Sequence, residues 1–169
     1  MDAMQVLLER RSIRKFTTET IAEPLINKLL EAAMFAPSSM NKQPWHFIVV
    51  RERAFLDQIP SLHPHAKMIY KAPLVIIICG DSTIEPIEAY NAINCAAATQ
   101  NLLLAAYALE LGGVWLGVYP NAERLENIRK LFSLPDTIIP VSMVAIGYPD
   151  EKKEQPHRFF PERIHWEKW

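Results

Sequence analysis

Glycine and cysteine are both scarce in this chain, which has five glycines and two cysteines among 169 residues. Two cysteines do not make a disulfide scaffold for a chain of this size, and Cys79 and Cys95 lie in segments that read as a buried strand and a buried helix. The glycines form neither the dinucleotide fingerprint of three spaced glycines between strand and helix nor a phosphate loop ending in Gly-Lys-Ser/Thr. We therefore expect a reducing, cytoplasmic setting and neither of these two glycine-rich phosphate sites.

The net charge is also small, and the hydrophobic runs are short. The net charge of −1 gives no electrostatic footprint for nucleic acid or for an anionic membrane. The longest strongly apolar run, residues 74–79, falls far short of the roughly 18 residues that cross a bilayer, and the first residues lack the order of a signal peptide. The five histidines show no metal-ligand spacing, and we interpret His63 and His65 as an exposed loop feature. No nucleic-acid, membrane or metal partner is expected.

Hydrophobic periodicity predicts helices interleaved with strands. Helices are expected over residues 2–11, 20–36, 54–59, 85–111 and 121–132, and strands over residues 46–50, 74–79, 114–117 and 138–146. Thr20 and Glu23 match a capping box, with Pro24 in the first turn. Gly112 and Gly113 are expected to stop the long fourth helix. Four strands and one dominant apolar helix suit an α+β layer structure in a single domain over residues 1–169.

The chain changes character beyond Asp150. Large aromatic residues, including Phe159, Trp166 and Trp169, stand in a charged tail that has no core-like period. Such a tail cannot bury these side chains locally. Two interpretations stay open: the tail from about residue 151 packs on a second subunit, or it folds back on its own domain.

A cluster of basic residues follows the first helix. Arg10, Arg11 and Arg14 surround Ser12 in a stretch of five residues. One interpretation is a solvated helix end, because the helix dipole favours cations there. The other is phosphate binding, because three arginines are more than capping requires and their forked donors match phosphate oxygens in pairs.

Residues 36–45 form a second polar loop, which contains Pro37, Ser38, Ser39 and Asn41. Serine and asparagine are common in turns, so the loop is first of all a helix stop. Ser38 is no convincing nucleophile, since it lacks the small-residue elbow that exposes such a serine and no base is assignable to it. The residues alone thus indicate an α+β protein that is expected to pair with a second copy and is a candidate to bind a phosphorylated cofactor.

The two loops and several later segments resemble the nitroreductase family of flavin-dependent oxidoreductases. The matching segments follow the family's order from one end of the chain to the other: residues 10–16, 32–33, 36–45, 112–117 and 146–149, with Arg158, His165 and Trp166. The resemblance implies a central, mostly antiparallel sheet flanked by helices, in an intertwined homodimer. It also implies one FMN in each of two sites at the subunit interface.

The resemblance assigns one part of the FMN site to each chain. On one chain, Arg10, Ser12, Arg14 and Arg158 would meet the phosphate and ribityl chain, and Arg11 would stand near the flavin edge.

The partner chain would line the flavin ring and its tail with Pro37, Ser38, Ser39 and Asn41. The segment of Trp115, Leu116 and Gly117 would pass the ring and present backbone amides to it. Met40 and Lys42 fall at variable positions of the motif and are assigned no role.

The resemblance also implies an activity. NADH or NADPH would pass hydride to the flavin N5 and leave, and a small electron-poor acceptor such as a nitroaromatic or a quinone would then bind the same face in a ping-pong cycle. The absence of an acid–base pair is then expected, because the flavin carries the chemistry. The alternatives are a non-catalytic module that binds or stores FMN, and flavin fragmentation or reductive dehalogenation on the same fold. Larger members carry a long insertion where residues 80–85 form a short turn here, so the substrate range stays open.

Overall fold

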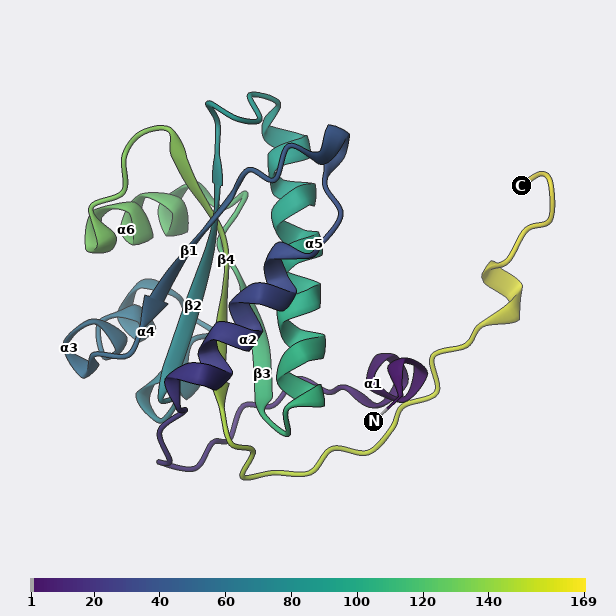
Figure 1. Ribbon diagram of the computed structural model, residues 1–169, viewed down its shortest axis with the longest axis horizontal. Coiled ribbons are helices and arrows are strands. Elements are labelled where there is room, and N and C mark those ends of the chain that lie inside the picture. Colours follow the sequence, from purple (N-terminus) through teal and green to yellow (C-terminus); the bar gives the residue numbers. More distant parts are fainter. Residues whose placement is uncertain (1) are drawn as a thin grey trace.

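A four-stranded sheet lies at the centre of the structure, a computed structural model that describes residues 2–169 (Figure 1). Its strands are β1 (Trp45–Val50), β2 (Leu74–Asp81), β3 (Gly112–Gly117) and β4 (Ile138–Gly147). Their order is β1-β2-β4-β3, and all three pairings are antiparallel. The expected α+β class and mostly antiparallel sheet are confirmed.

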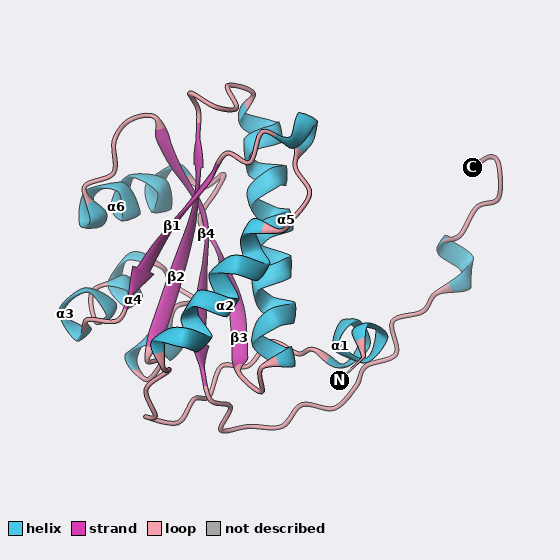
Figure 2. Cartoon of the chain, in the orientation of Figure 1, coloured by secondary structure: helices cyan, strands magenta, loops and turns pink. Residues whose placement is uncertain are grey.

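Helices cover both faces of the sheet (Figure 2). One face packs against α2 (Glu23–Met34) and α5 (Glu88–Ala108), and the other against α3 (Arg53–Leu56), α4 (Ile59–Leu62) and α6 (Ala122–Phe132). Alternate residues of β2 therefore enter different cores: Ile76 and Ile78 meet the α2 and α5 side, whereas Ile77 meets the other. Because β2 is buried on both faces, its sequence is continuously apolar rather than alternating.

The observed ends of α2 and α5 show that two predictions are wrong. The N-cap of α2 is Ala22, which makes no side-chain cap bond, so the predicted capping box of Thr20 and Glu23 is wrong, although Pro24 does lie in the first turn. Gly112 and Gly113 do not stop α5. They are the first residues of β3, and the left-handed turn after the helix is made by Glu110, at φ 62°. The N-cap of α6 is Asn121, as its sequence indicates.

Several short elements complete the chain. They are α1 (Ala3–Glu9), the 3₁₀ turns η1 (Ser39–Asn41) and η2 (Lys67–Tyr70), and η3 (Pro161–Arg163) in the tail. The tail leaves the end of β4, runs past α1 and ends far from the sheet, so it does not fold back on the body (Figure 1). Within residues 2–169, no helix has the length and apolar character of a membrane span.

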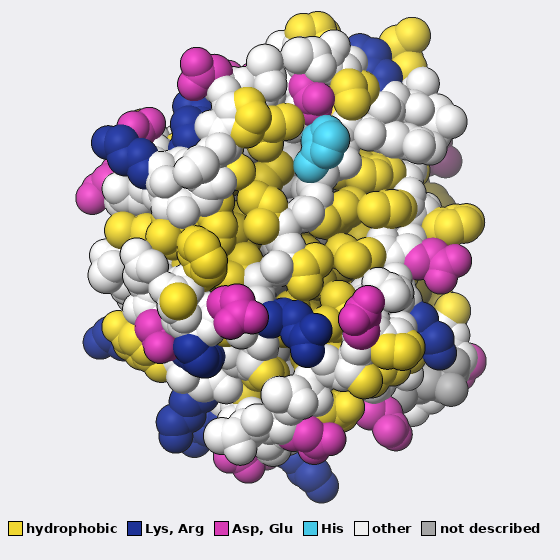
Figure 3. Space-filling view, turned by 60° about the vertical axis from the view of Figure 1, so that its left-hand side comes forward, with side chains coloured by type: hydrophobic (Ala, Val, Ile, Leu, Met, Phe, Trp, Pro, Cys, Tyr) yellow, Lys and Arg dark blue, Asp and Glu magenta, His cyan; other side chains and the backbone are white. Residues whose placement is uncertain are grey.

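Apolar side chains are exposed on the body of the protein and also on α1 and the tail. Figure 3 shows hydrophobic side chains gathered in a band across one face, with charged side chains around it. Elsewhere, large apolar side chains are exposed on α1, at the end of α2, on α5 and along the tail: Met4, Leu7, Leu8, Met34, Phe35, Tyr90, Ile93, Phe159, Trp166 and Trp169. Contiguous apolar surface of this kind marks an interaction face.

Candidate functional site

The predicted arginine cluster forms beside the start of β3. Ser12 pairs with Gly113 in a parallel bridge, and the Ile13 amide donates a hydrogen bond to the Gly113 carbonyl at 3.0 Å. Arg11 is fixed by its Nη1, which donates to the Leu8 carbonyl at 2.8 Å, and by its Nε, which donates to a tail carbonyl at 3.2 Å. The segment 10–13 is therefore held between α1, the tail and the sheet edge.

Arg10 is the most constrained member of this cluster. Burial, followed by the nearby charges of Arg158 and Arg11, lowers the pKa of the Arg10 guanidinium. Its Nε is buried and has no hydrogen-bond partner among the described residues. Arg11 and Arg158 line an adjoining hollow of about 570 Å³ together with Phe159. Three guanidiniums with an unmet buried donor form a site that an anion would complete.

Arg14 lines a second hollow, which is basic and has a volume of about 560 Å³. Its other cations come from Lys15 and from η2 and the residue after it, Lys67 and Lys71, and Tyr70 also lines it. The Arg14 amide donates to the Glu151 carboxylate at 2.6 Å, which ties the start of the tail to this segment. The sequence reasoning missed Lys67 and Lys71, because nothing in their spacing places them beside Arg14.

The second predicted loop is held by its own chain. The Ser39 amide donates to Asn94 Oδ1 at 2.9 Å, and the Gln43 amide donates to Ser38 Oγ at 3.0 Å. Lys42, which was assigned no role, forms an ion pair of 2.9 Å with the buried Glu85. The loop also contains Met40, Asn41 and Gln43 at positive φ. Pro37, Ser38, Ser39 and Asn41 are thus presented on a fixed loop with exposed or half-buried side chains.

The two predicted half-sites lie at opposite ends of α5. Asn94, near the start of this helix, anchors the loop 37–43, whereas Tyr107, near its end, bonds Glu9 of α1 beside the arginines. The helix has 21 residues, which is about 30 Å of length. One chain therefore does not bring its two half-sites together, and a site that uses both needs a second chain.

The third predicted segment is the edge strand β3. Since the Gly113 carbonyl points away from β4, the backbone groups of Trp115 and Gly117, two and four residues on, point the same way. Trp115 is partly exposed and Leu116 is buried. From Gly113 to Gly117 this edge runs about 13 Å. This edge of β3 therefore leads from the arginine cluster, beside Gly113, to Gly117.

Gly117 differs from the other glycines. A Cβ on Gly80, Gly112 or Gly147 would meet atoms of this chain at 3.0 Å or less, and none of these residues has positive φ. A Cβ on Gly117 would meet nothing within 4 Å. The packing of the chain therefore does not require a glycine here, whereas a ligand that approaches the backbone closely would.

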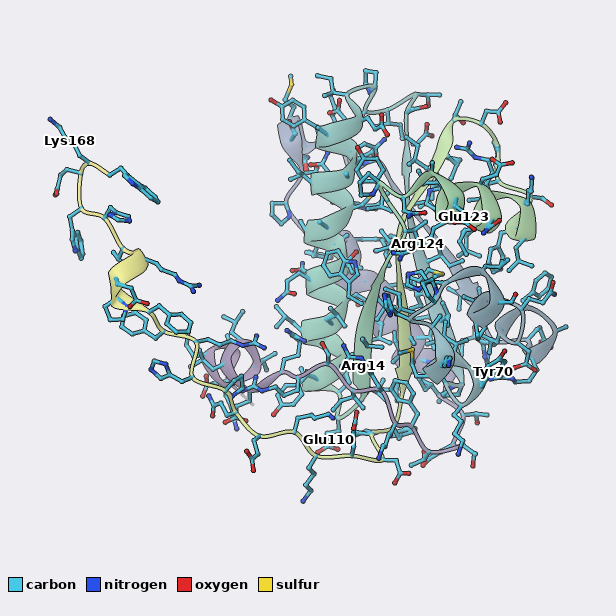
Figure 4. All side chains as sticks on the ribbon, turned by 180° about the vertical axis from the view of Figure 1, so that it is seen from behind. Arg14, Tyr70, Glu110, Glu123, Arg124 and Lys168 are labelled. Atoms are coloured by element: carbon cyan, nitrogen blue, oxygen red, sulfur yellow. The ribbon has the colours of Figure 1, made fainter. Side chains whose placement is uncertain are left out.

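Two side chains that the sequence reasoning did not connect with the site meet at the Gly117 carbonyl. His63 Nε2 lies 2.9 Å from this oxygen, and Arg124 Nη1 donates to it at 3.0 Å. His63 is buried, so its interpretation as an exposed loop residue is wrong, although His65 is exposed. Figure 4 shows Arg124 at the start of α6, with Arg14 lower on the same side of the molecule. Neither contact has a local sequence signal, because both join residues across the fold.

A comparison with protein families decides the identity. The model of the nitroreductase family matches residues 7–62 and 60–148. The chain belongs to the nitroreductase family. The matched residues include Arg10, Arg11 and Arg14, the loop 37–43 and the edge strand β3, whereas Arg158 lies beyond them.

Relatives within the nitroreductase family match over the whole chain. A protein of Methanothermobacter thermautotrophicus, provisionally named an NADH dehydrogenase/NAD(P)H nitroreductase, is 48% identical over 169 residues, which is 100% of this chain and 88% of the relative. A crystal structure with the same provisional name, from Parabacteroides distasonis, is 38% identical with a TM-score of 0.94 and covers 98% of each chain. A nitroreductase from Desulfovibrio desulfuricans, solved in complex with FMN, is 29% identical with a TM-score of 0.87 and covers 100% of this chain and 99% of its own.

Proposed function

We propose that this protein is an FMN-dependent oxidoreductase that takes hydride from NADH or NADPH and passes it to a small electron-poor acceptor, such as a nitroaromatic or a quinone. The observation that carries the proposal is the position of the half-sites. A cationic cluster with an unmet buried donor and a preformed polar loop stand at opposite ends of one helix. Membership of the nitroreductase family, and relatives whose names and titles include NAD(P)H nitroreductase and FMN, support the same activity.

The residues at the arginine end fit a phosphomonoester. Arg10, Arg11 and Arg158 offer several charged donors, and the free Arg10 Nε lacks the acceptor that a phosphate oxygen would provide. Ser12 lies between these arginines and the sheet edge. These four residues, with Arg14, would hold the phosphate and ribityl end of FMN.

The residues along β3 fit a flat ring. The outward-facing backbone of Trp115 and Gly117 offers amide donors, and the open space at Gly117 allows close approach. Leu116 holds the strand in place from its buried side.

The chemistry comes from the cofactor. When bound at these residues, FMN would supply the hydride chemistry between NADH or NADPH and an acceptor that binds after the donor has left. The protein binds and orients the cofactor, leaves one face open and supplies positive charge. It needs no acid–base pair of its own.

The complete site requires two chains. The loop 37–43 of one protomer would meet the arginine end of the other, and two-fold symmetry would produce two equivalent sites. The exposed apolar residues of α1, α5 and the tail would be covered in this homodimer, with the tail from about residue 151 packed on the partner. The two free, buried cysteines fit a reducing, cytoplasmic setting.

The proposal is tested by the colour and reactivity of the purified protein. We expect a yellow protein, or one made yellow by added FMN, that runs as a dimer and is bleached by NADH or NADPH without oxygen. Stopped-flow reduction should be fast enough to support turnover with a nitroaromatic acceptor. A colourless protein that FMN does not reconstitute contradicts the proposal. A yellow protein that reacts with neither nicotinamide would instead indicate a module that stores FMN.

A further inference from the structure

A cation stands beside the Gly117 carbonyl, at the edge of β3. Arg124 belongs to the first turn of α6, and its own amide donates to Asn121 Oδ1 at 2.9 Å. Its side chain reaches across to the Gly117 carbonyl, where Nη1 donates at 3.0 Å. Arg124 is therefore held at two points: the helix cap binds its backbone amide, and the edge strand binds its guanidinium.

The second donor at this carbonyl is neutral. The His65 amide donates to His63 Nδ1 at 3.2 Å, so the proton of the imidazole is on Nε2, which donates to the Gly117 oxygen at 2.9 Å. Burial, together with the charges of Arg124 and His65, lowers the pKa of His63. The positive charge at Gly117 is thus that of Arg124.

The charge of Arg124 is not compensated by this chain. Among residues 2–169, no carboxylate forms an ion pair with its guanidinium within 4.0 Å, and its one side-chain hydrogen bond is that to Gly117. A guanidinium has five N–H donors. The remaining donors, on a half-buried and fixed side chain, are available to a ligand at the strand edge beside Gly117.

We propose that Arg124 determines substrate specificity by binding an anionic group, a carboxylate or a phosphate, on the molecule that exchanges hydride at Gly117. This inference rests on the proposed function, since it assumes that substrates bind beside the ring that β3 carries. The arginine cluster does not serve this purpose, because it lies about 13 Å away along the strand edge. Arg124 acts on binding and takes no part in the transfer itself.

The test compares two acceptors that differ in charge and little in shape. With the FMN-loaded protein, 4-nitrobenzoate should give a higher kcat/KM than 4-nitrobenzamide. Arg124→Gln should lower kcat/KM for the nitrobenzoate about tenfold and leave the nitrobenzamide within about twofold, because only the charged partner loses a charge-assisted hydrogen bond. Arg124→Lys keeps the charge and should retain most of the preference. Lys130→Gln, which removes an exposed charge from the same helix, is the matched control.

A binding measurement removes the dependence on turnover. Isothermal titration of the oxidised, FMN-loaded protein should show benzoate binding more tightly than benzamide, and Arg124→Gln should abolish that difference. Parallel titrations with NADH and NADPH separate the sources of the anion. A loss confined to NADPH would assign the anionic group to the donor's extra phosphate, and a loss with the benzoates to the acceptor.

Several results would overturn the proposal. Equal kcat/KM for the two acceptors in the unchanged protein, together with equal affinity for NADH and NADPH, leaves Arg124 without a role in specificity. A loss of the same size with Arg124→Lys, or with the neutral acceptor, would show that the residue only supports the strand. A failure of the proposed function itself looks different, because then the protein binds no FMN or reduces neither acceptor.

Discussion

The two ends of α5 hold their polar groups in opposite ways. At the arginine end, cations outnumber their partners and the buried Arg10 Nε has none among the described residues. At the other end, Ser38 and Asn94 satisfy backbone amides of the loop, and Lys42 is paired with Glu85. The first region carries charged donors in excess, whereas the backbone of the second is ordered by bonds within its own chain, although Asn94 Nδ2 there is also buried without a partner among the described residues. A loop of the second kind can be offered to another protomer without first being ordered, which lowers the entropic cost of assembling a shared site.

The largest effect is expected at the proposed dimer interface, which would bring the arginine end of one chain to the loop end of the other. In the full-length double variant Phe159→Ser with Trp166→Ser, two exposed aromatic side chains of the tail are lost. Buried aromatics contribute much of the free energy of interfaces, so the proposed homodimer should dissociate roughly 100-fold more readily. Sedimentation equilibrium measures the dissociation constant. The thermal stability of the body should hardly change, because these residues contact neither core.

The arginine end is tested by Arg10→Gln. Removing a charged donor from the cluster should weaken FMN binding by about 1.5–3 kcal/mol, since a hydrogen bond to a charged group contributes about that much. Quenching of FMN fluorescence measures the affinity. Arg51→Gln, which removes an exposed arginine at the start of the loop after β1, serves as the control. Unchanged affinity in Arg10→Gln would remove Arg10 from the phosphate site.

The loop end is tested by pH and by Lys42→Met. The hydrogen bond from Lys42 is the main cause that lowers the pKa of Glu85. This pair therefore stabilises the folded protein above the ordinary pKa of a glutamate, and its contribution is lost as the pH falls through the lowered value. Lys42→Met should raise the pKa of Glu85 and move the acid-unfolding midpoint to higher pH. FMN affinity should fall less than in Arg10→Gln. Acid titration followed by circular dichroism checks the midpoint, with Lys28→Met as an exposed control.

The sequence predicted the elements well because their signals are local. The apolar run of β2, the Asn121 cap of α6 and the apolar face of α2 each depend on residues near one another. The strand order depends on contacts between distant segments and had no such signal. The resemblance placed the chain in its family, which the comparison confirmed. The individual assignments of site residues stay predictions.

The errors share a physical cause. His63 was interpreted as part of an exposed loop, yet it is buried and contacts Gly117, 54 positions away. Lys42 was assigned no role because it falls at a variable position of the motif, and its ion pair with Glu85 joins the loop to a segment more than 40 residues away. Glu110 rather than a glycine adopts the left-handed conformation after α5, and Gly112 instead lies where Ile13 packs tightly on the strand. Each case was decided by tertiary packing rather than by local preference.

The length of α5 has a geometric consequence for any two-fold pair of these chains. If each end of the helix carries a different part of the proposed site, its 21 residues would set the distance between the two sites of the proposed homodimer. Inserting one helical turn would lengthen the helix by about 5 Å and misalign both sites at once. The length of α5 is therefore constrained in such an enzyme, whereas the length of its outer loops is not.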